Sequence, residues 1–328
     1  MILPANMSGA EKREKMAVME AAISSSLSHP NIVQTYTYSI REVVQQDCDA
    51  PTATRDSTLT AGTTSRLGQR MESSNGSIHS YEVRLILEFC DKGCLRDALD
   101  DGAFLTVGGV NYAAILETAA DVAKALLHLH SLNVLHSDLK ARNVLLSTGG
   151  ADGRGVVAKV GDFGLSLKMD HLETHISQVF QGTMTHMAPE ILLDGRVSKA
   201  ADVYAYGITL WELYTGGSPF KGVPRALLGH QITRKRLRPV FPEGVPRAYR
   251  DLAERCWQED WEARPTFDDV LRDLQALRAS DPRPTPPIHV SPRMRSALRP
   301  NSSSSPPGSR GTASGGGGGG GGAPGGGA

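Results

Sequence analysis

The sequence predicts an α+β protein, because its strand-like segments come early and most of its helix-like segments come later. Two stretches of β-type composition, residues 32–40 and 81–89, flank a polar region in the first third of the chain. Segments with apolar residues at helical spacing dominate the remainder, including residues 112–131 and the almost wholly apolar residues 202–215. Strands and helices that are segregated in this way are typical of the α+β class.

The composition disfavours several classes of function. The chain has 328 residues, with 35 Lys plus Arg and 35 Asp plus Glu, so its formal net charge is zero. We therefore expect no nucleic-acid partner, and we interpret the basic run at residues 234–238 as a solvated surface. No apolar run is long enough to span a membrane. The four cysteines lack zinc-site spacing and fit a reduced compartment, so a cytoplasmic location is the default expectation.

Two regions of biased composition define the expected domain limits. Residues 279–328 are rich in Pro, Ser and Gly and end in a glycine tract, so they cannot bury enough apolar area to offset chain entropy. Residues 43–79 are polar and are expected to form a disordered insertion between two strands. The sequence thus predicts one domain over residues 1–278, with this insertion, and a disordered tail.

The first element is a helix from Gly9 to about Leu27. Ser8 and Glu11 have the spacing of a capping box, and apolar residues recur every three or four positions until a His-Pro step ends the helix. Glu20 falls in the middle of the apolar face. Either the helix is rotated so that Glu20 reaches water, or Glu20 is an inward carboxylate that needs a cationic partner, because an unpaired buried charge is costly.

The later elements are predicted from the same two periodicities. Strands are expected at residues 32–40 and 81–89, and two shorter strands should flank a Gly-rich turn. Thr266 and Asp269 have the spacing of an N-terminal cap for the last helix. The expected short strands are residues 144–146 and 156–160, and the expected helices are residues 94–99, 112–131, 202–215, 248–257 and 267–277.

Three motifs occur in an order that carries chemistry. They are His136-Ser137-Asp138-Leu139-Lys140-Ala141-Arg142-Asn143, Asp162-Phe163-Gly164, and Ala188-Pro189-Glu190 preceded by Gly182-Thr183. Together they resemble the signature set of the protein kinases. The segments HPNIV at residues 29–33, LAERCW at 252–257 and RPTF at 264–267 resemble the tyrosine-kinase-like group of Ser/Thr kinases. The resemblance covers about residues 8–278, apart from the insertion, and implies a bilobal fold with a mainly helical large lobe.

The resemblance also implies an activity, the transfer of the γ-phosphate of MgATP to Ser/Thr hydroxyls of a protein substrate. Asp138 matches the aspartate that accepts or orients the substrate proton, and Lys140 matches the lysine on the transferred phosphate. Asn143 and Asp162 match the Mg²⁺ ligands, whose hard oxygen atoms suit this ion. Thr183 matches the small hydroxyl residue of the substrate-docking stretch.

Other positions carry over from the same resemblance. The adenine site would include Leu87 as the gatekeeper, the backbone of Glu88 and Cys90, and Leu145 beneath the ring. Glu190 and Arg264 match a structural ion pair. The structural or regulatory set expected from the family is Glu20, His136, Phe163, Thr183, Glu190, Asp202 and Arg264.

The start of the chain departs from the family pattern. Glu20 matches a helix glutamate that pairs with a lysine on a preceding strand, yet no lysine comes before Lys12, and no Gly-rich phosphate loop occurs there. We therefore expect that the first three strands of the small lobe are missing, as in a late-starting gene model. For the chain as given, feeble binding of ATP is the expectation.

Two substitutions inside the motifs also depart from the family. Ser137 replaces an arginine that usually binds a phosphate on the activation segment, so control by phosphorylation there should lose its cation. His186 replaces a usual aromatic residue and is expected on the surface. The alternative to an active kinase is a catalytically impaired pseudokinase that serves as a scaffold; a small-molecule phosphotransferase is the third hypothesis.

Overall fold

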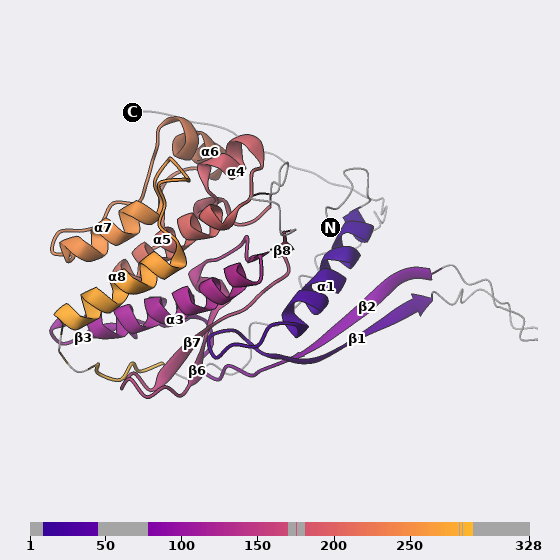
Figure 1. Cartoon of the computed structure of the whole chain (residues 1–328), viewed down its shortest axis with the longest axis horizontal. Coiled ribbons are helices and arrows are strands. Elements are labelled where there is room, and N and C mark those ends of the chain that lie inside the picture. Colours follow the sequence, from indigo (N-terminus) through magenta and orange to yellow (C-terminus); the bar gives the residue numbers. More distant parts are fainter. Residues whose placement is uncertain are drawn as a thin grey trace, which may run out of the picture. The chain divides into compact units, whose positions relative to one another are not determined.

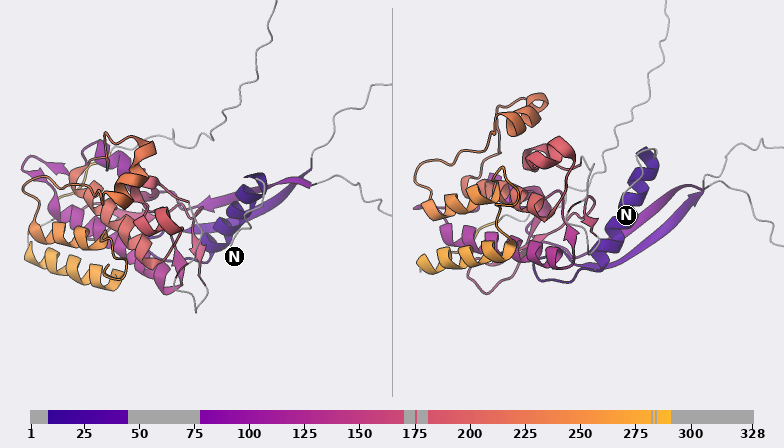
Figure 2. Two further views of the ribbon diagram at one scale, coloured as in Figure 1. Left: turned by 90° about the horizontal axis from the view of Figure 1, so that it is seen from above. Right: turned by 45° about the horizontal axis from the view of Figure 1, so that its top comes forward.

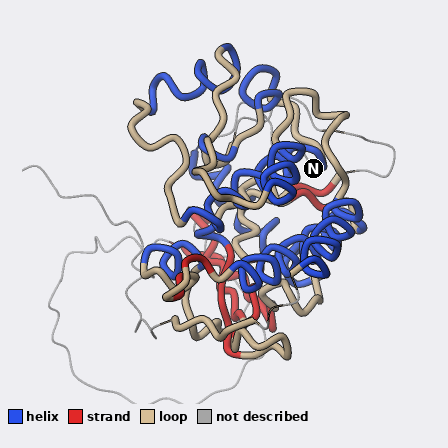
Figure 3. The backbone as a smooth tube through the Cα atoms, turned by 90° about the vertical axis from the view of Figure 1, so that its left-hand side faces the viewer, coloured by secondary structure: helices blue, strands red, loops and turns tan. Residues whose placement is uncertain are grey.

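The computed structural model of the chain describes residues 9–44, 78–169, 175, 181–281, 283 and 285–290. It confirms the α+β class, and more of the described backbone is helical than is in strands (Figure 3). The helices are α1 (Gly9–Ser25), α2 (Leu95–Asp100), α3 (Tyr112–Ser131), α4 (Pro189–Asp194), α5 (Lys199–Thr215), α6 (Arg225–Arg234), α7 (Arg247–Cys256) and α8 (Phe267–Ser280), with 3-10 turns η1 (Ala141–Asn143) and η2 (Met184–His186). Within these ranges no helix is both long and apolar enough to cross a bilayer.

The strands form four antiparallel pairs, β1 with β2, β3 with β4, β5 with β8, and β6 with β7. Their bounds are β1 (Thr35–Val44), β2 (Ile78–Leu87), β3 (Leu105–Thr106), β4 (Gly109–Val110), β5 (Val134–Leu135), β6 (Val144–Thr148), β7 (Val156–Val160) and β8 (Leu167–Lys168). The first pair places Tyr38 opposite Leu85. Both strands are shifted towards the expected insertion: β1 begins three residues later and ends four later than the expected range 32–40, and β2 begins three earlier and ends two earlier than 81–89. Residues 45–77 of the expected insertion lie outside the described residues.

Helix α1 packs along β1 and β2, as two further views show (Figure 2). Ala21 and Ile23 of this helix are buried, as is Leu27 directly after it. The segment after the helix is tied to β7, because Ile32 forms a bridge with Val160. The expected capping serine, Ser8, lies outside the described residues. The inward face of α1 also carries Glu20, which brings this carboxylate to the candidate site.

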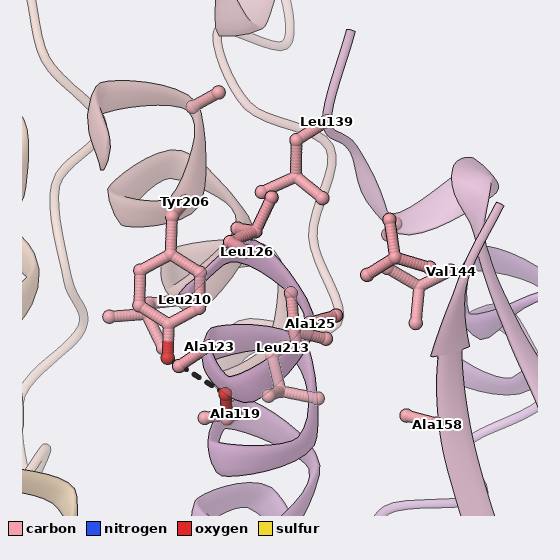
Figure 4. Packing of buried hydrophobic residues seen from close by; sticks show 14 of the residues in the cluster. Ala119, Ala123, Ala125, Leu126, Leu139, Val144, Ala158, Tyr206, Leu210 and Leu213 are labelled. Atoms are coloured by element: carbon pink, nitrogen blue, oxygen red, sulfur yellow. Dashed lines mark hydrogen bonds between the residues drawn. The ribbon is translucent and has the colours of Figure 1, made fainter. Parts of the chain in front are cut away.

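Helices α3 and α5 build the centre of the core. Asn111 caps the N-terminus of α3 through its side-chain oxygen, which accepts from the Ala114 N–H at 3.2 Å. Small alanines on α3 let α5 approach closely, and the hydroxyl of Tyr206 donates to the Ala119 carbonyl at 2.9 Å (Figure 4). This bond satisfies the polar end of an otherwise apolar, fully buried ring.

The last two helices agree with the sequence. Helix α8 begins at the expected place, with both halves of the Thr266–Asp269 capping box formed. Helix α7 begins one residue before the expected range and buries Tyr249 and Leu252 against the core. Helices α4 and α6 and the pairs β3–β4 and β5–β8 were not expected from the sequence. A strand of two residues is too short to show a period.

The packed part of the chain continues beyond residue 278, the expected end of the domain. Helix α8 reaches Ser280, and residues 285–290 run back beneath α3 towards β6 and β7 (Figure 1). Thr285, Ile288 and Val290 are buried there. Specific hydrogen bonds hold a segment whose composition alone indicated disorder.

The basic run at residues 234–238 is only partly a solvated surface. Arg238 is half-buried, and its guanidinium donates to the Trp257 carbonyl at 3.0 Å and to Glu259 at 2.8 Å. It also lies over the ring of Tyr204, 5.2 Å from the ring centre. The interpretation of this run as solvated was therefore wrong for Arg238, because composition does not show which cation of a run turns inward.

Candidate active site

A buried carboxylate holds the backbone of the loop between β5 and β6, residues 136–143, which carries the first motif and is here called the catalytic loop after the family resemblance. Asp202, in the first turn of α5, accepts the N–H groups of His136 and Ser137, each at 2.9 Å. Its Oδ2 also lies 2.9 Å from Nε2 of His130. Burial would raise the pKa of Asp202. The hydrogen bond and the charge of His130, together with the backbone hydrogen bond from Ser137, lower this pKa instead. The loop thus has one fixed anchor on the central helix.

His136 connects the loop to the strand that precedes Asp162. Its Nδ1 accepts the N–H of Asp138 at 3.3 Å, so Nε2 carries the ring proton and faces the Gly161 carbonyl at 3.1 Å. The ring lies 5.6 Å from that of Phe163, which is buried. His136 therefore joins the motif that contains Asp138 to the one that contains Asp162, through one hydrogen bond and one ring contact.

Asp138 lies at the centre of a compact polar cluster. Nζ of Lys140 is 2.5 Å from its Oδ2 and donates to the Thr183 hydroxyl at 2.8 Å. The N–H and hydroxyl of Thr183 both donate to Oδ1, at 2.8 Å and 2.7 Å. Burial would raise the pKa of Asp138, but hydrogen bonds from Lys140 and Thr183 and the lysine charge hold it below its usual value. Asp138 is therefore ionised at neutral pH.

Asn143 shares this cluster and connects it to Asp162. Its Nδ2 donates to the Asp138 carbonyl at 2.9 Å and approaches Oδ2 of Asp138 at 3.3 Å. Its own carbonyl accepts the Gly161 N–H at 2.9 Å, directly before Asp162. With the amide nitrogen so engaged, the oxygen of the Asn143 side chain is the atom left to act as a ligand.

Glu20 and Asp162 approach the same glycine. A Cβ atom built on Gly164 would lie 3.4 Å from Oδ1 of Asp162 and 3.4 Å from Oε2 of Glu20. Burial first, and the Asp162 charge second, raise the pKa of Glu20. The described part of the chain contains no ion pair to Glu20. Glu20 is partly buried and lies towards Asp162, but the cationic partner that the inward alternative required is not among the described residues.

The residues that are expected around adenine differ in their exposure and in their neighbours. Leu87 ends β2 with its side chain exposed, whereas Leu145 on β6 lies near Gly161. A Cβ on Gly161 would lie only 3.0 Å from the Val33 side chain and would make an ordinary contact with Leu145 at 3.9 Å. The close approach of Val33 therefore favours glycine at this position.

The segment after β2 exposes backbone groups beside a half-buried ion pair. Glu88 pairs with Lys159 at 3.0 Å, and its backbone N–H donates to the Gln34 carbonyl at 2.8 Å. The Cys90 carbonyl accepts the Gly93 N–H at 3.4 Å. Burial raises the pKa of the Cys90 thiol to about 11, which keeps it protonated and unreactive at neutral pH.

The activation segment is fixed at its C-terminal end. A Cβ on Gly182, whose φ is 118°, would lie 2.8 Å from the Ser137 carbonyl oxygen, so only glycine passes the catalytic loop here. Further on, Arg264 forms a bidentate, fully buried pair with Glu190, at 2.7 Å and 2.9 Å. The guanidinium also lies over the Tyr204 ring. Two hydroxyl residues of this segment, Thr174 and Ser177, lie outside the described residues.

The sequence did not identify a second buried carboxylate, Glu212 of α5. Its Oε2 lies 3.0 Å from Nε2 of His186 and accepts the Ala141 N–H at 3.2 Å. Burial would raise the pKa of Glu212, but the bond and charge of His186 lower it, with help from Arg96. The expectation that His186 lies on the surface was wrong. The available signal was an acidic residue inside an otherwise apolar helix.

Ser137 has a strained backbone and an unsatisfied hydroxyl. Its φ is 65°, and its Oγ is buried with no hydrogen-bond partner among the described residues. A cavity of about 10 Å³ lies between Ser137, Thr183 and His186, with no Lys or Arg in its described lining. It could hold about one water molecule. Thus no described cation takes the place of the usual arginine.

Comparisons with known proteins agree with this arrangement. A family model described as protein tyrosine and serine/threonine kinase matches residues 72–274, more than half of the chain. The chain is 30% identical over 199 residues to the probable serine/threonine-protein kinase drkC of Dictyostelium discoideum, covering 60% of this chain and 25% of that relative. It is 31% identical over 193 residues to the serine/threonine-protein kinase STY46 of Arabidopsis thaliana, covering 59% of this chain and 32% of that relative. The chain therefore spans about a quarter to a third of these relatives, and it belongs to the protein tyrosine and serine/threonine kinase family.

Proposed function

We propose that this chain transfers the γ-phosphate of MgATP to Ser or Thr hydroxyls of protein substrates, as a member of the tyrosine-kinase-like group. The observation that carries this proposal is the cluster in which Lys140 and Thr183 surround the buried carboxylate of Asp138. A carboxylate with a lowered pKa, next to a lysine and the Thr183 segment, suits phosphoryl transfer. This reaction requires that the reacting groups are positioned and that charge on the phosphoryl group is neutralised.

Asp138 would orient the substrate hydroxyl and receive its proton. The hydroxyl of Thr183 would set the distance between the docking loop and this carboxylate, since it donates to Oδ1 at 2.7 Å. Lys140 already faces the opposite oxygen, and in the reaction it would neutralise charge on the transferred phosphoryl group. Each of these proposed roles uses a side-chain atom of Asp138, Lys140 or Thr183 that already takes part in the hydrogen bonds among these three residues.

Asp162 and the amide oxygen of Asn143 would hold Mg²⁺. Hard oxygen donors suit this ion, and the raised pKa of Glu20 beside Asp162 indicates negative charge that a cation would relieve. When bound with the nucleotide, the ion would neutralise phosphate charge. The residues of this chain contribute by fixing the donors, chiefly through the Gly161 N–H bond to the Asn143 carbonyl.

Adenine would lie against the segment after β2. The N–H of Glu88 is taken by Gln34, which leaves its carbonyl and the N–H of Cys90 without hydrogen bonds among the described residues. These two groups offer an acceptor and a donor on one edge. Leu145 would pack beneath the ring and Leu87 beside it, at the gatekeeper position.

A pseudokinase scaffold is the second candidate function. The observation that favours it is the Glu20 carboxylate, for which the described residues supply no cation. Intact Asp138, Lys140, Asn143 and Asp162 favour catalysis. For the 1–328 chain itself we expect weak binding of MgATP, because its sequence contains neither a Gly-rich phosphate loop nor a lysine before the first helix to hold the phosphates. A cytoplasmic location stays a prediction.

The deciding experiment is transfer of radiolabelled γ-phosphate to a generic basic protein. It compares the 1–328 chain, a chain extended with upstream coding sequence, and the extended chain with Asp138→Asn. We expect label from the extended chain and at least 100-fold less from its Asp138→Asn variant, in keeping with the loss of a positioned base. No transfer from any of the three, with the extended chain folded and monodisperse, would refute catalysis and leave the scaffold.

A further inference from the structure

Residues 285–290, here called the C-terminal strap, occupy a site built from three parts of the domain. The Asn111 side chain donates from Nδ2 to the Pro286 carbonyl at 3.0 Å. The Ile288 N–H donates to the Arg154 carbonyl at 3.0 Å. Arg278 of α8 donates from Nη2 to the Thr285 hydroxyl at 3.1 Å. The strap lies beyond residue 274, the last residue matched by the kinase family model.

The turn between β6 and β7 is shaped to receive the strap. Arg154 is 1% exposed, and its guanidinium is held by Thr118 and Asp121 of α3 and by Asp152, all at 2.7 Å. These bonds fix the carbonyl that accepts from Ile288. A buried guanidinium with three partners is costly to assemble, and the sequence alone did not single it out.

Thr285 lies at the tightest point of this site. Its carbonyl oxygen would be 2.6 Å from a Cβ on Gly153, so the strap passes where only glycine leaves room. Thr285 is 8% exposed, and the Arg278 that meets its hydroxyl is already bonded to Glu117 at 3.0 Å. A phosphate on this hydroxyl would add bulk and about two negative charges at a buried position, beside a guanidinium that already pairs with Glu117.

Proline follows Thr285, and the next residue is also proline. Residues before proline are biased to extended backbone, so the released strap would present Thr285 in an extended segment, the form in which protein kinases read a Ser/Thr-Pro site. We propose that Thr285 is a phosphorylation site for a proline-directed protein kinase, and that its modification keeps the C-terminal strap off the domain.

The modification is an ordinary phosphoryl transfer and requires transient opening. The Thr285 hydroxyl oxygen bonds to the γ-phosphorus of MgATP, the bond from that phosphorus to the β–γ bridging oxygen breaks, and ADP leaves. The hydroxyl proton passes to the base of the modifying kinase. Because the docked Thr285 is buried, its rate should follow the fraction of chains with an open strap.

The test uses the 1–328 chain with Asp138→Asn, so that all phosphate comes from an added, purified proline-directed kinase. Phosphate on Thr285 is followed by mass spectrometry, with Ser305 as an internal reference because Pro306 follows it. Asn111→Asp keeps an N-cap oxygen for α3 but turns the donor facing Pro286 into an acceptor. We expect this variant to modify Thr285 at least 5-fold faster, with Ser305 unchanged.

Hydrogen exchange gives the second readout. In the phosphorylated chain the amides of residues 149–155 and of Ile288 should exchange faster, and Ile288→Ser should have the same effect without phosphate. Modification of Ser305 while Thr285 stays unmodified in both opening variants would overturn the proposal. So would equal rates with and without the opening substitutions, or slower exchange after phosphorylation, since the last would mean that phosphate tightens the strap.

Discussion

At the scale of single residues, the site depends on bonds that short sequence motifs cannot show. Lys140 is two residues from Asp138 and could be paired with it from the sequence, but the Thr183 hydroxyl comes from a segment 45 residues away. The resemblance to a family supplied its position, whereas its two bonds to Asp138 come from the structure. Glu212 and His186 had no such guide, and their pairing forms only where α5 meets η2.

Thr183 is the first residue whose role can be tested. Thr183→Ala removes the hydroxyl that donates to Asp138 and accepts from Lys140, so the carboxylate should lose its fixed orientation. Hydrogen bonds to charged groups contribute about 1.5–3 kcal/mol, which corresponds to roughly a 10- to 100-fold lower kcat in the proposed transfer reaction. The measurement is phosphate transfer at saturating MgATP.

Thr183→Ser is the matched variant for that measurement, because it keeps the hydroxyl and removes only a methyl group. It should recover most of the activity lost in Thr183→Ala. If the alanine variant is as active as the wild type while both proteins bind substrate equally, the hydroxyl does not position Asp138.

Glu20 gives a prediction about pH. Burial and Asp162 raise its folded pKa, so the ionised carboxylate destabilises the folded chain, and stability contributed by Glu20 is lost as pH rises from the unfolded pKa of about 4.3 towards the folded value. Glu20→Gln removes this charge. It should raise Tm at pH 7, on the order of 2 °C, and have little effect near pH 4.

The measurement for Glu20→Gln is thermal unfolding across that pH range, without nucleotide. Glu262→Gln, on an exposed loop, is the control and should change Tm little at either pH. A lower Tm for Glu20→Gln at pH 7 would mean that Glu20 has a cationic partner after all.

At the scale of elements, prediction succeeded where a pattern was long enough to repeat. The range 112–131 matches α3 at both ends, and residues 156–160 match β7, because burial imposes a clear period on each. Helix α5 starts three residues before its expected range, with Ser198 at the N-cap position. Strands of two residues, such as β5 and β8, exist only because their partners meet across the catalytic loop, so local sequence could not reveal them.

The ion pair between Glu190 of α4 and Arg264 tests how these elements are joined. Arg264→Met would keep an apolar stem but leave Glu190 buried without its partner, and breaking such a pair costs about 3–5 kcal/mol. The unfolding free energy from urea denaturation should fall by that amount. Arg247→Met is the control, because the side chain of Arg247 is 93% exposed and its pairing with Asp251 should contribute little. Equal losses in the two variants would contradict a structural role for the buried pair.

At the scale of the whole chain, composition gave the domain limits only approximately. The expected end at residue 278 rested on the Pro, Ser and Gly content of residues 279–328. That argument considers only the apolar area within the segment. It omits the hydrogen-bond partners and the apolar surface that the rest of the domain presents to the segment. Ile288 and Val290 are buried because hydrogen bonds from Asn111 and to the β6–β7 turn hold the backbone of the strap against the domain. Long-range recognition of this kind has no signature in local composition.

The last prediction compares chains that end at residue 278 and at residue 292. The shorter chain loses the buried strap residues and leaves apolar surface on α3 and the Arg154 turn exposed. Burial of Ile and Val contributes about 1.5–3 kcal/mol each at most, and the cost of ordering the strap offsets much of this gain. A net loss near 1–2 kcal/mol would lower Tm by roughly 2–8 °C for a domain of this size.

Calorimetry of both chains, with Asn111→Asp in the longer one, tests this prediction. The substitution should bring the longer chain close to the shorter one and have no effect in the shorter chain, where the strap is absent. Equal Tm values for the two unsubstituted chains would mean that the strap adds nothing to stability, and that the domain ends where its composition changes.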